Sequence, residues 1–81
     1  MKEEKKIIEI IANISEVEAD DITPDDELRM IGINSLEIVE LLVQLEEHFD
    51  ILFDIFELNI ETLTDVRSVI DITNNYLLKR E

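Results

Sequence analysis

The chain has 81 residues, 46% of them apolar, with one Gly, one Pro and no Cys, so we expect a single packed domain (residues 1–81) without disulfides or thiolate metal sites. Its 21 acidic residues and 7 Lys and Arg give a net charge of −14 at pH 7. A field of that sign repels nucleic-acid phosphates and anionic lipids and attracts basic protein surfaces, so we expect no nucleic-acid or membrane partner.

The N-terminal stretch is the first predicted helix. Its isoleucines recur at helical spacing, which predicts a helix over residues 3–15. The same stretch is charged and lacks the apolar run and cleavage site of a signal peptide. We therefore expect a cytoplasmic protein.

A long loop is predicted after this helix. Between Ser15 and Ile33 the periodicity breaks, and this part holds the only Pro (Pro24) and the only Gly (Gly32). Loops of about seventeen residues are uncommon in compact domains and are usually functional. This connection is therefore a candidate part of the functional site.

The second predicted helix spans residues 35–50 and begins at Ser35. Asn34 is a favoured N-cap, and Glu37 three residues later completes a capping-box pattern. Apolar residues at helical spacing predict a stripe that faces the core. This stripe consists of Ile38, Leu41, Leu42, Leu45 and Phe49.

The same helix carries a second apolar band, on the other side of its helical wheel. The band consists of Leu36, Val39 and Val43. The acidic residues Glu40, Glu46, Glu47 and Asp50 surround it. An apolar patch with an acidic border predicts a docking face for a partner with a basic surface. Packing of the band beneath the long loop is the alternative, and the pattern alone favours neither.

The C-terminal part is predicted to hold one short and one long helix. Residues 51–63 are apolar and irregular, with a short helix expected near residues 55–61. The long helix is expected to start with Thr64 as its cap and Asp65 in its first turn. Since no stretch alternates like a strand, the predicted fold class is all-α, a four-helix bundle with three longer helices, one short helix and a long first loop.

Around Ser35 the sequence resembles the acyl carrier protein (ACP) family. The stretch "GINSLEIVELLVQLEEHFDI" is similar to the family motif, in which a Ser-Leu pair closely preceded by Gly opens an acidic second helix. The resemblance covers nearly the whole chain, from the N-terminal helix through "DDITPDDEL" to a final helix entered through "LTDV". It implies the acyl-carrier type of helical bundle.

The resemblance also implies a carrier function. A phosphopantetheinyl transferase would attach 4′-phosphopantetheine to Ser35, between Asn34 and Leu36, and the terminal thiol would hold acyl groups as thioesters. The helix after Ser35 would be the recognition helix, with partner-binding residues Glu37, Val39, Glu40, Val43, Glu46 and Glu47. Expected partners of this monomer are acyl-ACP synthetases, ketosynthases, acyltransferases or similar enzymes of fatty-acid, lipid or polyketide-type synthesis.

Departures from the family pattern define the alternatives. Asn34 stands where the family usually has Asp, so a carrier-fold interaction module that is no longer modified is one alternative. Residues 51–63 are about two residues longer and more apolar than in typical fatty-acid carriers, which indicates a specialised carrier, with extra core packing as the other interpretation. An aminoacyl or peptidyl carrier is the alternative within the carrier class.

Two other function classes, an enzyme and a calcium-binding protein, compete with the carrier hypothesis. His48 is the only His, and thirteen helical positions of about 1.5 Å place it roughly 20 Å from Ser35, too far to act as its general base. We therefore expect no catalytic residues. The acidic stretch "EADDITPDDE" lacks the EF-hand pattern, so we expect no specific metal site either.

Overall fold

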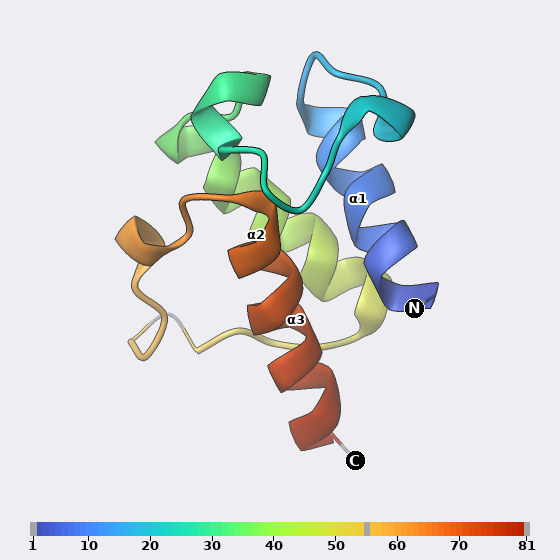
Figure 1. The fold of residues 1–81 in the computed structure, drawn as a ribbon. Helices are drawn as coiled ribbons and strands as arrows, with labels where there is room; N and C mark the ends of the chain where they lie inside the picture. Colours follow the sequence, from blue (N-terminus) through green and yellow to red (C-terminus); the bar gives the residue numbers. More distant parts are fainter. Residues whose placement is uncertain (1, 55, 81) are drawn as a thin grey trace.

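Three long helices form the body of the domain in the computed structural model, which describes residues 2–54 and 56–80 (Figure 1). They are α1 (Lys2–Ile14), α2 (Ser35–Phe49) and α3 (Val66–Arg80). Three 3-10 turns lie in the connections: η1 (Ala19–Asp21), η2 (Leu28–Ile31) and η3 (Ile60–Thr62). The described residues form no strand, only an isolated bridge between Glu27 and Asp65. The prediction of an all-α fold is confirmed.

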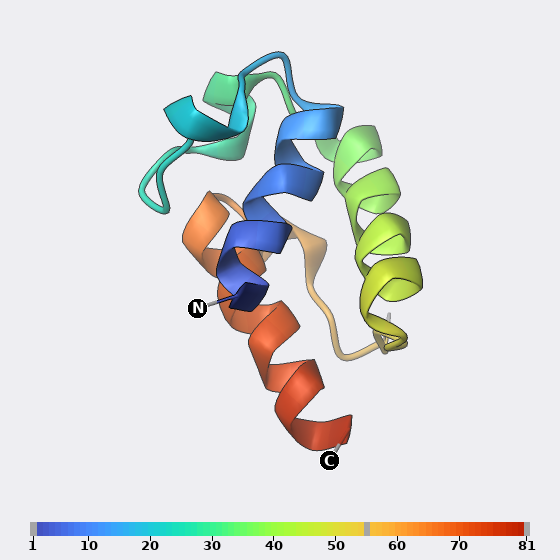
Figure 2. The same ribbon diagram turned by 90° about the vertical axis from the view of Figure 1, so that its right-hand side faces the viewer.

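The helices run along one another in an up-down-down order. α1 is antiparallel to α2, whereas α3 runs in the same direction as α2 (Figures 1 and 2). The connection from α1 to α2 crosses the end of the domain where α2 begins. The connection from α2 to α3 leaves the opposite end and returns along the side of the bundle (Figure 1). This order places Ser35 at the same end as the first connection. No helix in the described ranges combines the length and apolar character needed to cross a membrane.

The three helices share one apolar core. Side chains without exposed surface come from every long helix: Ile7, Ile11, Leu41, Leu45, Val66 and Val69. The predicted core stripe of α2 is confirmed for its four buried members, whereas Phe49 is only half-buried. Thr73 of α3 is also fully buried, and its hydroxyl donates to the carbonyl oxygen of Val69 at 2.8 Å, so its polar group is satisfied inside the core.

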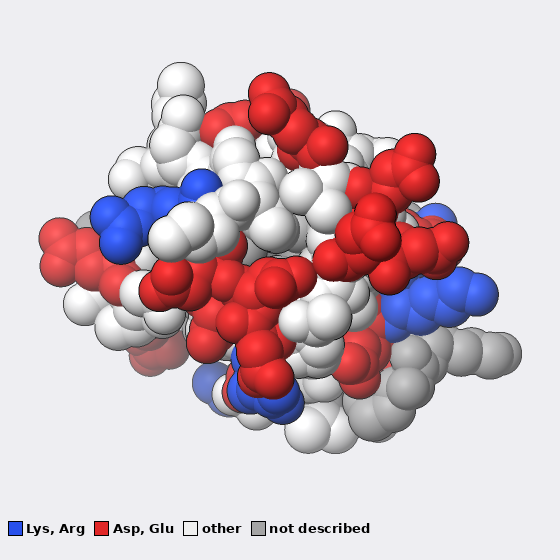
Figure 3. Space-filling model, turned by 45° about the horizontal axis from the view of Figure 1, so that its top comes forward, with Lys and Arg blue, Asp and Glu red and all other residues white. Residues whose placement is uncertain are grey.

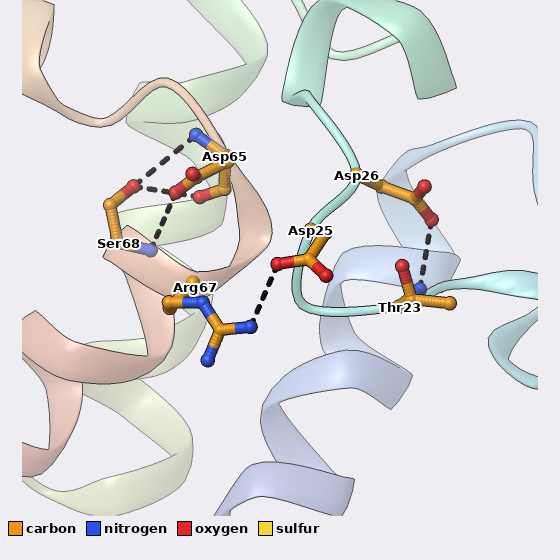
Figure 4. Close-up of polar contacts among 6 residues, drawn as sticks. All are labelled: Thr23, Asp25, Asp26, Asp65, Arg67 and Ser68. Atoms are coloured by element: carbon orange, nitrogen blue, oxygen red, sulfur yellow. Dashed lines mark hydrogen bonds and ion pairs between the residues drawn. The ribbon is translucent and has the colours of Figure 1, made fainter.

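The predicted boundaries of all three long helices are corrected. α1 spans Lys2–Ile14 rather than residues 3–15. α2 ends at Phe49, one residue early, because Asp50 adopts the left-handed conformation (φ 54°, ψ 49°). The cap of α3 is Asp65 rather than Thr64. The Asp65 carboxylate accepts from the Ser68 N–H at 2.8 Å, and the Ser68 hydroxyl accepts from the Asp65 N–H at 3.3 Å (Figure 4). This reciprocal pair satisfies two backbone donors at the start of the helix.

The short helix predicted near residues 55–61 is wrong in its position. Residue 55 lies outside the described residues, residues 56 and 57 form a turn, and the helical turn η3 follows at Ile60–Thr62. The buried side chains of this region are Phe53, Leu58 and Leu63. Their spacing of five residues does not fit one face of a helix, which places neighbours three or four residues apart on the same side. An irregular backbone instead brings each of these side chains into the core separately.

The first connection is fastened to the start of α3. Three backbone hydrogen bonds of 2.9–3.0 Å join residues 24–28 to residues 64–67. Arg67 donates to the Asp25 carboxylate at 2.8 Å, and the two side chains point toward each other across this junction (Figure 4). The hydrogen bond and charge of Asp25 raise the pKa of the Arg67 guanidinium above its ordinary value. Both side chains are exposed, so the backbone bonds contribute more to this junction than the ion pair.

Candidate functional site

Ser35 is exposed at the first position of α2. Gly32 brings the chain to it through a left-handed conformation (φ 88°) that other residues rarely adopt. Asn34 then lies extended immediately before the helix. Because free backbone N–H groups and the positive end of the helix dipole lie at this point, a phosphate ester on Ser35 fits here both sterically and electrostatically.

The predicted capping box at the start of α2 is present. Asn34 Oδ1 accepts from the Glu37 N–H at 3.0 Å, and Glu37 Oε1 accepts from the Asn34 N–H at 3.1 Å. These two hydrogen bonds hold the first turn of α2 in place, and so they fix the backbone position from which the Ser35 side chain extends. Glu37 is therefore already engaged, and its role in partner binding stays a prediction.

Replacing Asn34 tests this cap. Asn34→Ala is expected to lower the free energy of unfolding by about 0.5–2 kcal/mol, because the Glu37 N–H loses its acceptor. Asn34→Asp keeps an acceptor oxygen and should retain wild-type stability. Urea unfolding followed by circular dichroism measures both. Asn75→Ala, at an exposed position inside α3, is the matched control, and an equal loss there would contradict a capping role for Asn34.

A pocket of about 260 Å³ lies beside Ser35. Its apolar lining consists of Leu28, Ile33, Ile38 and Leu63, and its charged lining of Glu27, Arg29 and Glu61. Ser35 is itself part of the lining, so a group bonded to its hydroxyl starts at the pocket surface. The sequence pattern did not reveal this pocket, because its lining combines α2 with residues on both sides of it in the chain.

The second apolar band of α2 faces outward. Leu36 is 78% exposed, and Val39 and Val43 are each 46% exposed, so the alternative that they pack beneath the long loop is wrong. Met30 of η2 is 81% exposed as well. The sequence pattern does not predict the exposure of Met30, because a 3-10 turn within an aperiodic loop leaves the direction of its side chains open.

The acidic residues of α2 around this band fall into two groups. Glu40 and Glu47 are exposed and form no hydrogen bond or ion pair with any residue in the described ranges. Glu46 is half-buried, and its Oε2 accepts from the Phe53 N–H at 2.8 Å. In Figure 3, which tilts the top of Figure 1 toward the reader, acidic side chains lie in several groups around uncharged surface, and basic ones are few. Glu40 and Glu47 are thus the acids of α2 that are free to meet a partner.

The chain after α2 is tied to the bundle by two side chains. Glu46 holds the Phe53 N–H, and the Tyr76 hydroxyl oxygen accepts from the Asp54 N–H at 3.0 Å. The rings of Phe53 and Tyr76 meet edge to face with centroids 4.9 Å apart. These contacts hold residues 53 and 54 against α2 and α3.

Beyond this tie the apolar residues divide between core and surface. Leu58 and Leu63 are buried, whereas Leu52 and Phe56 are 81% and 95% exposed. Ile55 lies outside the described residues. Extra core packing therefore explains some of the apolar character of residues 51–63, but not Leu52 and Phe56.

His48 is exposed, and its ring meets that of Phe49 edge to face with centroids 4.9 Å apart. It lies in α2 thirteen residues after Ser35, which opens that helix. Within residues 2–54 and 56–80, no group of three or more His, Cys, Asp or Glu residues is placed to hold a metal ion. The calcium hypothesis finds no candidate site in this part of the chain.

Comparisons with known proteins bear on the site as well as the fold. Residues 5–74 match the family model described as a phosphopantetheine attachment site. The acyl carrier protein of Syntrophobacter fumaroxidans is 39% identical over 77 residues, which cover 94% of this chain and 88% of that protein. The acyl carrier protein of Syntrophus aciditrophicus is 36% identical over 70 residues, which cover 85% of this chain and 81% of that protein.

A solved structure agrees with these relatives at the level of the fold. The acyl carrier protein of Thermotoga maritima superposes with a TM-score of 0.77 at 20% identity, covering 94% of this chain and 87% of that one. It shows the same fold. The chain therefore belongs to the acyl carrier protein family, whose members are carriers with a 4′-phosphopantetheine prosthetic group and not enzymes.

Proposed function

We propose that this domain, residues 1–81, carries acyl groups as thioesters on a 4′-phosphopantetheine arm attached to Ser35. The exposed hydroxyl of Ser35 at the N-terminus of α2 is the observation that supports this attachment point most directly. When bound, the arm supplies the thiol that forms the thioester, which this chain cannot supply because it has no Cys.

The residues around Ser35 have separate tasks in this proposal. The N–H groups of the first turn of α2 and its dipole stabilise the negative charge of the phosphodiester. Asn34 and Leu36 flank the attachment point, and the capping box keeps the first turn in place although Asn34 is neutral. The cap would stabilise the first turn in an unmodified interaction module as well, so the mass measurement below is what distinguishes the two alternatives.

The outward face of α2 is the proposed docking surface for partner enzymes. Leu36, Val39 and Val43 supply its apolar centre, and Glu40 and Glu47 supply acids that attract a basic patch. Expected partners are a phosphopantetheinyl transferase and enzymes of fatty-acid, lipid or polyketide-type synthesis, such as acyl-ACP synthetases, ketosynthases and acyltransferases. We propose that the domain acts among them as a cytoplasmic monomer.

Two exposed apolar side chains support a specialised carrier. Leu52 and Phe56 are not needed for the core. If cargo or a partner covered them, the unfavourable free energy of their contact with water would be reduced. A bulky or long acyl group is the cargo that we propose.

Intact mass spectrometry tests the attachment. The protein is incubated with coenzyme A and a broad-specificity phosphopantetheinyl transferase, beside Ser35→Ala. The wild type is expected to gain the mass of one phosphopantetheine and the variant nothing, although its circular dichroism and melting temperature should match those of the wild type. If neither this reaction nor the protein purified from its own host shows the added mass, the proposed carrier function is wrong and the interaction module takes its place.

A further inference from the structure

Arg29 is a cation placed beside the proposed attachment point. It belongs to η2, it is exposed, and it lines the same pocket as Ser35. The other charged residues of that lining, Glu27 and Glu61, are acidic. A cation at this position makes the local electrostatic potential less negative, in a chain whose overall charge is strongly negative.

The guanidinium of Arg29 has no partner among residues 2–54 and 56–80, since no hydrogen bond or ion pair connects it to them. Several other basic side chains are engaged. They pair as Lys6 with Glu9 at 3.4 Å, Arg67 with Asp25 at 2.8 Å, and Lys79 with the ring of Tyr76 at 5.3 Å. Arg29 therefore keeps its donors available at the site where a phosphate would be attached.

We propose that Arg29 binds the phosphodiester of the arm on Ser35, an inference that rests on the proposed function. A guanidinium presents paired N–H donors that match two phosphate oxygens, and this geometry gives stronger binding than a point charge does. Asn34, next to Ser35, is neutral, and its side-chain oxygen is occupied by the Glu37 N–H. It therefore adds no negative charge that would compete with the phosphate for Arg29.

The acids of the pocket explain why this contact matters. Without the arm, Arg29 offsets the charges of Glu27 and Glu61 through solvent. Attachment of the arm adds a further negative charge at the same pocket. If Arg29 were absent, this charge would repel both carboxylates, so the loaded domain would lose stability relative to the unloaded one.

Nitrogen-15 NMR of the arginine side chains tests the contact directly. The chain has three arginines, Arg29, Arg67 and Arg80, so the Nε–Hε region holds three signals that Arg29→Gln and Arg67→Gln assign. Spectra are recorded before and after loading with coenzyme A and the transferase, with loading checked by intact mass. The Arg29 signal is expected to shift on loading, and the Arg67 signal, already held by Asp25, to stay in place.

The outcomes separate the two proposals. A full mass gain with an unmoved Arg29 signal overturns the role of Arg29 and leaves the carrier function standing. Without any mass gain both proposals fail, because the phosphodiester that Arg29 is to bind would not exist.

Melting temperatures of loaded and unloaded protein give a second, independent readout. In Arg29→Gln at low salt, loading should lower the melting temperature by about 1–4 °C more than it does in the wild type, and the difference should shrink in 1 M salt. Arg29→Lys keeps the charge without the paired donors, so its change in melting temperature on loading should lie between those of the wild type and Arg29→Gln. Lys79→Gln removes the same charge near the opposite end of α3 and is the control. If loading lowered the melting temperatures of Arg29→Gln and Lys79→Gln equally, the cause would be a general effect of net charge, and the proposed contact would be overturned.

Discussion

Leu45→Ala is expected to lower the free energy of unfolding by about 2–5 kcal/mol. Leu45 has no exposed surface, and it belongs to the core that α1, α2 and α3 share. Truncation removes its contacts and leaves a cavity that the surrounding helices fill only in part. Since small domains are stable by only about 5–15 kcal/mol, the loss would be a large share of the total. Urea unfolding followed by circular dichroism measures it.

Val43→Ala is the matched control for this prediction. Val43 lies on the same helix only two residues away, but it is 46% exposed. Its truncation should change the free energy of unfolding by no more than about 0.5 kcal/mol, as is usual for surface substitutions. Equal costs at the two positions would mean that both faces of α2 are packed, and the docking surface would then lose its basis.

Reversal of the charge at Glu40 is expected to slow modification by the transferase without unfolding the domain. Glu40 is exposed on the proposed docking surface, and unlike Glu46 its carboxylate accepts no hydrogen bond from a backbone N–H of the described residues. Glu40→Lys places a cation opposite a basic partner surface, so at low salt the rate of loading at subsaturating transferase should fall about tenfold. Intact mass over time measures the rate, and high salt should reduce the difference.

Glu18→Lys separates a surface effect from an effect of net charge. Glu18 is exposed in the first connection and makes no side-chain cap, so this variant changes the total charge by the same amount away from α2. Its loading rate should stay within about twofold of the wild type. Equal slowing by both variants would show that the overall field alone draws the transferase. Loss of the helical circular dichroism in Glu40→Lys would contradict its assignment to the surface.

The sequence predicted the features of this domain that arise from neighbours along the chain. The two faces of α2 and its capping box depend on spacings of three and four residues, which the pattern contains in full. The cap of α3 could not be chosen in this way, because Thr64 and Asp65 are both good caps. Contacts from distant residues decide between them: the Thr64 carbonyl accepts from the Leu28 N–H, and Val66 pairs with Asp26.

The parts of the site that the sequence did not reveal depend on contacts between separate segments. The pocket beside Ser35 combines residues from η2, α2 and the end of the second connection, so no local pattern contains it. Glu46 borders the same apolar band on the helical wheel as the free acids of α2, so the pattern does not set it apart from them. Only the position of the Phe53 N–H shows that its carboxylate holds the backbone.

The junction between the first connection and α3 determines when the surroundings of Ser35 can form as the chain is synthesised. The Ser35 end of the domain is closed by partners far along the chain, with Asp25 and Arg67 separated by 42 positions. Contacts of such separation form late, because the loop between them must close first. A nascent chain that has emerged only as far as residue 60 already contains Ser35 but lacks the residues that hold its surroundings. The surroundings of Ser35 are therefore complete only when the start of α3 has left the ribosome, so the proposed modification of Ser35 would wait for that point.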